Sequence, residues 1–196
     1  MLEKDSTQFI TSRDLEIFTI PTFAERMTEI RSRVSPKLEL LGERLTEAIA
    51  KETGEIVHYH VAKHARRTVN PPDETWVALS PSARGYKGYA HIAVGVGYFG
   101  SFVKLIAKAE SKEKVTLARA IMEFGSPKTI WLTKGDNLVE ASLERVQEVL
   151  EKKSYGVETG TVIEDVPGPT CDRWLDWSMQ EIAAIWSLYE FVRKKV

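Results

Sequence analysis

The spacing of the apolar residues changes at Gly54 from a helical repeat to a strand repeat. Before Gly54, four apolar residues recur at steps of three or four, which places them on one side of a helix. These residues are Leu38, Leu41, Leu45 and Ile49. After Gly54, residues 55–62 alternate between two faces, as a strand does. A chain that changes period in this way is predicted to combine helices with a sheet.

The same two periods assign the remaining elements. Short helices over about 11–15 and 21–33 are predicted to precede the long one, which Ser35 caps and Pro36 opens. Gly54 is its expected C-terminal stop. Strands are predicted over 75–79, 89–96, 101–110, 129–133 and 160–166, and helices over 112–124, 137–152 and 171–194.

The last of these helices, from Cys171 to Lys194, is apolar on two sides and is therefore predicted to be mostly buried. The predicted strands follow one another at hairpin distances, which favours antiparallel pairing. We therefore expect residues 1–196 to form a single α+β domain. Its largely antiparallel sheet is predicted to be flanked by N-terminal helices and a long buried C-terminal helix.

Cys171 is the single cysteine of the 196 residues, so no intramolecular disulfide and no zinc ribbon can form. This favours a reducing, cytoplasmic setting. Charged residues stand at the N-terminus where a signal peptide needs an apolar run, and no apolar stretch approaches the roughly 20 residues of a membrane span. We therefore expect a cytoplasmic protein without membrane association.

The formal net charge of −1 conceals an uneven distribution along the chain. Between His58 and His91 lie five basic and two acidic residues, whereas the rest of the chain carries 22 basic and 26 acidic residues. All four histidines, which are His58, His60, His64 and His91, fall in this basic window. Candidate chemistry is therefore concentrated there.

Gly95, Gly97 and Gly100 match the pattern G-x-G-x-x-G that binds dinucleotides when the last glycine opens a helix. Residues 101–110 follow with aromatic and β-branched residues in strand-like order, and the expected acidic residue would fall in a helix. A hairpin relieved by glycine therefore fits better than a nucleotide loop.

The histidines permit a metal hypothesis. His58 and His60 project from the same face of a strand, and three or four imidazoles suit Zn²⁺ and could activate water. However, Lys63, Arg66 and Arg67 crowd the same stretch, which disfavours a cation. A metal-assisted hydrolase is therefore kept as an alternative, and no metal ligand or cofactor is assigned.

The basic window instead predicts a site for a small anionic, possibly phosphorylated, ligand. The candidate binding residues are Lys63, Arg66, Arg67, Thr68, Asn70, Arg84, Lys87 and His91. His60 and His64 are the candidate general acid or base, because histidine alone titrates unaided near neutral pH. The opposing interpretation is a solvated basic loop whose arginines pair with acidic helices.

A third hypothesis is a nucleic-acid or protein binding module, in which the basic loop and the nearby Tyr59, Trp76 and Tyr86 contact phosphates and bases. The weak overall charge makes nucleic acid an unlikely partner. Neither catalysis nor an oligomeric state is assigned from the sequence.

The stretch KHARRTVNPPDETWVAL, with His60 before it and RGYK after it, is similar to the signature of the YktB-like family of bacterial proteins of unknown function. The similarity also covers SRDLEIFTI and ERMTEIRSRVSPKL near the N-terminus, and it does not include His58. The resemblance implies an α+β cytoplasmic domain of about this length. It implies no established reaction, cofactor or catalytic residue.

Overall fold

The structure is a computed structural model that describes residues 8–65, 69–135 and 137–195. Its helical elements are α1 (Ser12–Leu15), the 3-10 helix η1 (Glu16–Thr19), α2 (Phe23–Glu29), the π-helix η2 (Ile30–Val34), α3 (Ser35–Thr53), α4 (Lys114–Phe124), α5 (Leu143–Val149) and α6 (Cys171–Lys194). Its strands are β1 (His58–Val61), β2 (Glu74–Ser80), β3 (His91–Gly97), β4 (Gly100–Ala107), β5 (Thr129–Lys134), β6 (Asn137–Glu140) and β7 (Gly156–Ile163).

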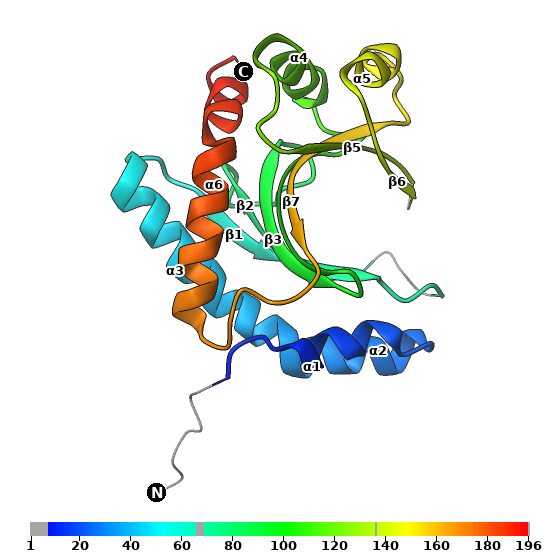
Figure 1. The fold of residues 1–196 in the computed structure, drawn as a ribbon, viewed down its shortest axis with the longest axis vertical. Helices are drawn as coiled ribbons and strands as arrows, with labels where there is room; N and C mark the ends of the chain where they lie inside the picture. The colour runs from blue at the N-terminus through cyan, green and yellow to red at the C-terminus, as the bar shows by residue number, and fades with distance from the viewer. Residues whose placement is uncertain (1–7, 66–68, 136, 196) are drawn as a thin grey trace, which may run out of the picture.

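In the described part of the chain, seven strands form one sheet in the order β1-β2-β3-β4-β7-β5-β6. Every neighbouring pair is antiparallel, and β7 is inserted between β4 and β5. Figure 1 shows that the sheet is strongly curved, with α3, α4, α5 and α6 on its outer, convex side. The predicted α+β class with an antiparallel sheet is therefore confirmed.

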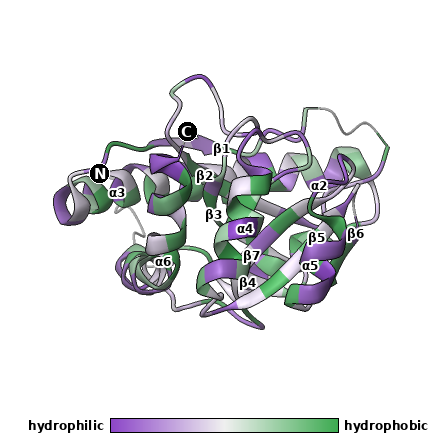
Figure 2. Ribbon diagram, turned by 90° about the horizontal axis from the view of Figure 1, so that it is seen from above, coloured by the Kyte–Doolittle hydropathy of each residue, from purple (hydrophilic) through white to green (hydrophobic). Residues whose placement is uncertain are grey.

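The main core lies between the convex side of the sheet and the helices. Val77 and Val94 face this core, and the α6 residues Trp174 and Ile185 pack into it from the other side. Trp174 is fully buried, and its indole N–H donates to the carbonyl oxygen of Ile10 over 3.3 Å. Figure 2, which is coloured by hydropathy, shows hydrophobic and hydrophilic residues mixed along the helices that cover the sheet. The long C-terminal helix is therefore part of the core, as predicted.

The concave side carries a smaller apolar cluster of Ala93, Phe102 and Ile106, against which Trp76 packs. The rings of this cluster occupy the space over Gly95, where a Cβ atom would lie 2.7 Å from the Phe102 ring. Two strands of a hairpin, β3 and β4, meet at this glycine-rich stretch. The G-x-G-x-x-G pattern is therefore a hairpin, as predicted, and no helix follows it.

Two sequence predictions are wrong at helix boundaries. Residues 137–152 were expected to form one helix, but Asn137–Glu140 is the strand β6, and α5 begins only after its cap, Ser142. The turn decides this, because Gly135 has a φ of 61° and lets Asn137 pair with Lys134. Val139 on this strand is 63% exposed.

The expected break before Pro36 is also absent, because the π-helix η2 joins α2 to α3. A proline lacks the amide hydrogen of a helical turn and crowds the carbonyl four residues earlier. In the π-turn at this point the Ser35 amide donates to the Ile30 carbonyl, and the helix continues through Pro36. Within the described ranges, the structure contains no helix that is both long and apolar enough to span a membrane.

Substitution of Gly42 should weaken the contact between α3 and the sheet. A Cβ atom at this position would lie 2.8 Å from the Tyr59 ring and from Val77 Cγ2. We expect Gly42→Ala to destabilise the protein by about 1 kcal/mol, because overpacking outweighs the better helix propensity of alanine. Urea unfolding measures this. Gly88→Ala is the control, since nothing lies within 4 Å of its added Cβ atom. A Gly42→Ala variant as stable as the wild type would contradict the prediction.

Candidate functional site

The segment 81–90, between β2 and β3, folds over the concave side of the sheet at its β1 end. Its turns are fixed by local hydrogen bonds, from the Ser80 hydroxyl to the Gly85 carbonyl over 3.2 Å and from the Arg84 amide to the Ser82 hydroxyl over 3.2 Å. At the end of the segment, the Ala90 amide donates to Glu113 Oε2 over 2.6 Å. The segment is therefore held at both ends.

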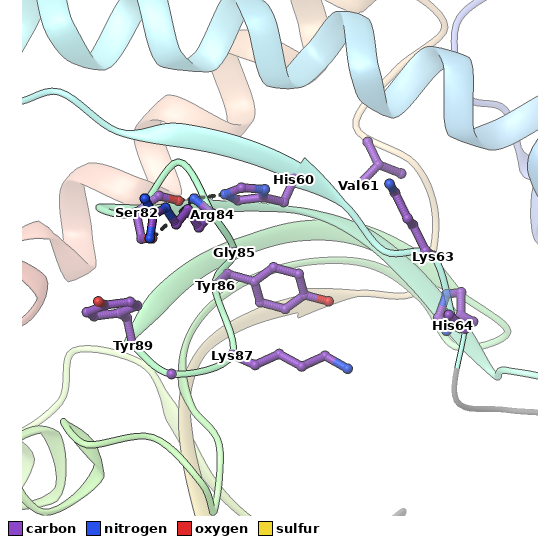
Figure 3. A pocket seen from close by; sticks show the side chains of 12 residues that line it. His60, Val61, Lys63, His64, Ser82, Arg84, Gly85, Tyr86, Lys87 and Tyr89 are labelled. Atoms are coloured by element: carbon purple, nitrogen blue, oxygen red, sulfur yellow. Dashed lines mark hydrogen bonds between the residues drawn. The ribbon is translucent and has the colours of Figure 1, made fainter.

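Tyr86 is the centre of this segment. Its ring lies 4.7 Å from the His91 ring and 6.0 Å from the His60 ring, measured between centroids. Figure 3 shows its hydroxyl directed towards the side on which Lys63 and His64 lie, with Lys87 running alongside. Burial raises the pKa of Tyr86 to about 12, so its hydroxyl is protonated at neutral pH and can donate a hydrogen bond.

A cavity of about 660 Å³, which we call the basic pocket, lies between β1, the residues that follow it and the segment 81–90. The residues that line it are His60, Val61, Lys63, His64, Ala65, Ser82, Arg84, Gly85, Tyr86, Lys87, Gly88 and Tyr89. This lining includes three cationic side chains and two histidines, and none of its described residues is a carboxylate. At neutral pH the described lining therefore carries three formal positive charges and no negative one.

His60 is held in one orientation. Its Nε2 lies 2.8 Å from the carbonyl oxygen of Ser82. Because a carbonyl oxygen only accepts hydrogen bonds, Nε2 carries a proton, and Nδ1 is the ring nitrogen that can exchange one. This bond also connects β1 to the segment 81–90 across the pocket, as Figure 3 shows.

His64 has a left-handed backbone conformation, with a φ of 48°. Among non-glycine residues this conformation is uncommon, and it is found at sites where the surrounding structure imposes it. Its Nε2 lies 3.2 Å from Thr75 Oγ1, and its ring meets Trp76 edge to face at 5.5 Å. These contacts fix the imidazole at the boundary of the basic pocket.

His91 is fully buried behind Tyr86 and does not line the basic pocket. Its Nδ1 lies 3.0 Å from the carbonyl oxygen of Tyr89 and therefore carries a proton. Its Nε2 has no hydrogen-bond partner among the described residues. Burial lowers the pKa of His91 to about 3, which keeps the imidazole neutral. His91 therefore adds no positive charge to the pocket.

The structure thus brings five of the predicted site residues together: His60, Lys63, His64, Arg84 and Lys87. Asn70 is exposed and is not part of the pocket lining. Arg66, Arg67 and Thr68 lie outside the described residues. The ion pairs between described residues do not involve Lys63 or Arg84, so the interpretation of a basic loop paired with acidic helices finds no support at these two positions.

Two positioning residues were not predicted from the sequence. Arg26 on α2 is buried, and its guanidinium donates to the carbonyl oxygens of Ile20 over 2.7 Å and Pro72 over 2.9 Å and to Asp73 over 3.2 Å. Arg26 therefore anchors the chain at Pro72 and Asp73, just before β2. Glu113 plays the same part at Ala90. Neither residue has a local sequence signal, because each acts on a partner far along the chain.

The histidines do not converge. Within residues 8–65, 69–135 and 137–195, no group of three or more His, Cys, Asp or Glu side chains is close enough to hold one metal ion. His58 lines a neighbouring cavity of about 340 Å³, which His60 also lines together with Thr46 and Ala83. The geometry therefore lends no support to the metal-assisted alternative.

Comparison with known proteins places this site in a wider group. The family model described as "domain of unknown function (DUF1054)" matches residues 10–152. A UPF0637 protein of Bacillus mycoides (strain KBAB4) is 45% identical over 116 residues. UPF0637 proteins of Bacillus cereus (strain B4264) and Bacillus thuringiensis (strain Al Hakam) are each 44% identical over the same length. Each match covers 59% of this chain and 56% of the relative, so the chain spans little more than half the length of these relatives.

Proposed function

The chain belongs to the DUF1054 family, and we propose that it binds a small anionic ligand, a phosphate group being the simplest, in the basic pocket. One observation carries the proposal. Lys63, Arg84 and Lys87 line a cavity of about 660 Å³, and none of the described lining residues is a carboxylate. Charge-assisted hydrogen bonds from such groups to phosphate oxygens are among the stronger polar interactions in proteins.

The individual side chains of the pocket support the same ligand. Tyr86 presents a protonated hydroxyl, and a phenol can donate to an anionic oxygen. The guanidinium of Arg84 offers a planar fork, whereas Lys63 acts as a point charge. The pocket volume exceeds that of one phosphate group, so the proposed ligand is a phosphorylated small molecule.

The proposal concerns binding. If the bound ligand reacts, His60 is the group best placed for proton transfer, because its bond to Ser82 fixes the ring and leaves Nδ1 to exchange the proton. His64 is the second candidate, at the far side of the pocket. A phosphorylated metabolite is also consistent with the reducing, cytoplasmic setting expected from the single cysteine.

Isothermal titration calorimetry with pyrophosphate tests the proposal. We expect the double variant Lys63→Ala/Arg84→Ala to weaken pyrophosphate binding by more than about 10-fold, because two charge-assisted contacts are lost. Both side chains are exposed and form no ion pair with described residues, so the fold should be unaffected.

The matched control is Arg31→Ala/Lys51→Ala, which removes the same formal charge from exposed positions on η2 and α3 that form no ion pair with described residues. This variant should bind pyrophosphate like the wild type. If both double variants weaken pyrophosphate binding equally, the effect comes from the net charge of the protein and the proposal is wrong. If the wild type does not bind pyrophosphate, the proposal is also refuted.

A further inference from the structure

A second cavity, of about 600 Å³, lies on the same concave side of the sheet, and we call it the aromatic pocket. Trp76 on β2, together with Tyr98 and Phe99 at the tip of the β3–β4 hairpin, lines one part of it. Asn137 and Leu138 on β6 line another part. Both His64 and Lys87 line this cavity as well as the basic pocket, so the two cavities adjoin.

Aromatic rings provide flat surfaces in this pocket. Tyr98 is 65% exposed although it is a large aromatic residue, so its position is not explained by core packing. Its amide donates to the carbonyl oxygen of Asp73 over 3.1 Å, which ties the hairpin tip to the start of β2. Its ring meets Phe99 edge to face at 5.3 Å. An exposed ring held in this way is a platform on which a planar group can stack.

The polar groups of the pocket offer hydrogen-bond acceptors and donors to a planar ring. Of the four carboxylates that line it, which are Asp73, Glu74, Glu110 and Glu158, Asp73 pairs with Arg26 at 3.2 Å and Glu158 pairs with Lys104 at 3.3 Å. A paired carboxylate still accepts hydrogen bonds from N–H groups. Asn137 and Thr133 add side chains that both donate and accept. This set matches the edge of a nitrogen heterocycle.

We propose that the basic pocket and the aromatic pocket form one cleft that binds a nucleotide. The phosphate would lie among Lys63, Arg84 and Lys87, and the base would stack on Tyr98. The inference rests on the proposed function for the phosphate group of the ligand, and it adds that the rest of the ligand carries a nucleobase. It makes no use of the G-x-G-x-x-G stretch, which is a hairpin.

Calorimetry with a matched set of ligands tests the inference. The probes are AMP, GMP, CMP and UMP, with ribose 5-phosphate as the ligand that has no base and adenosine as the ligand that has no phosphate. At least one mononucleotide should bind about 10-fold more tightly than ribose 5-phosphate, because base stacking on an aromatic side chain adds affinity.

Tyr98→Ala should abolish this difference and leave the affinity for ribose 5-phosphate unchanged. Tyr98→Phe keeps the ring and should retain the preference for the nucleotide. Phe124→Ala is the control for loss of an exposed aromatic residue, since Phe124 is 57% exposed on α4 and contacts Phe191 of α6. It should bind every ligand like the wild type.

The outcomes separate the two proposals. If ribose 5-phosphate binds through Lys63 and Arg84 but no base adds affinity, the nucleotide inference is wrong and the proposed function stands. If adenosine binds as tightly as AMP, or if no phosphate ligand binds, the proposed function also fails. Tighter binding of a single-stranded oligonucleotide than of any mononucleotide would overturn the inference in favour of a nucleic-acid surface.

Discussion

Acidification below pH 6.5 should destabilise the protein through His91, by about 1.4 kcal/mol for each pH unit until the pH approaches 3. In the folded protein, burial lowers the pKa of His91 to about 3, whereas the unfolded chain has the ordinary value of 6.5. Between these values the unfolded state binds one proton more than the folded state. Stability is therefore complete above pH 6.5 and declines as the pH falls, by about 4–5 kcal/mol in total.

The prediction is tested by urea unfolding of the wild type and of His91→Phe at several pH values between 6.5 and 4. The variant cannot titrate at this position, so its free energy of unfolding should depend much less on pH. Glu113 acts in the opposite direction, because burial raises the pKa of its carboxyl, but it is present in both proteins. Parallel pH profiles for the two proteins would contradict the assignment of a buried, neutral His91.

Much of the fold could be predicted because it depends on local signals. Gly54 ends α3 with a φ of 75°, and the Asp14 carboxylate accepts a hydrogen bond from the Thr11 amide at the start of α1. The error at Asn137 has a local cause of a different kind. Asn137 and Glu140 have the spacing of a capped helix, but the glycine turn before them sets a hairpin. The resemblance to the YktB-like family is confirmed by the family match.

The sequence predicted which residue types make up the candidate site, but not which of them are buried. The basic stretch predicted that His60, Lys63 and His64 would line one site, but only His60 lies on β1, and Lys63 and His64 follow the end of that strand. The burial of His91 depends on contact with Tyr86, which lies in the segment 81–90. The conformation of this segment cannot be predicted from a periodic pattern of residues. Arg26 contacts Pro72 across 46 positions of sequence. Such long-range contacts depend on the assembled fold and leave no local pattern.

Loss of the Glu158 carboxylate should be the most damaging single change on the concave side of the sheet. Lys104 on β4 is 1% exposed, and its ammonium lies 4.9 Å from the Phe102 ring centroid and 5.1 Å from that of Trp131. Glu158 on β7 is its carboxylate partner at 3.3 Å. We expect Glu158→Leu to cost about 3–5 kcal/mol of stability, because it leaves a buried cation without a counterion.

The double variant Lys104→Met/Glu158→Leu decides whether charge is the cause. Removing both charges restores an apolar contact among Phe99, Phe102 and Trp131, so the double variant should recover most of the loss. Urea unfolding of the two single variants and the double variant gives the coupling energy directly. If Glu158→Leu is no less stable than the double variant, the aromatic rings alone suffice to hold the Lys104 ammonium. In that case the ion pair between Lys104 and Glu158 would contribute no stability. That result would also weaken the assignment of Glu158 as a paired carboxylate at the aromatic pocket.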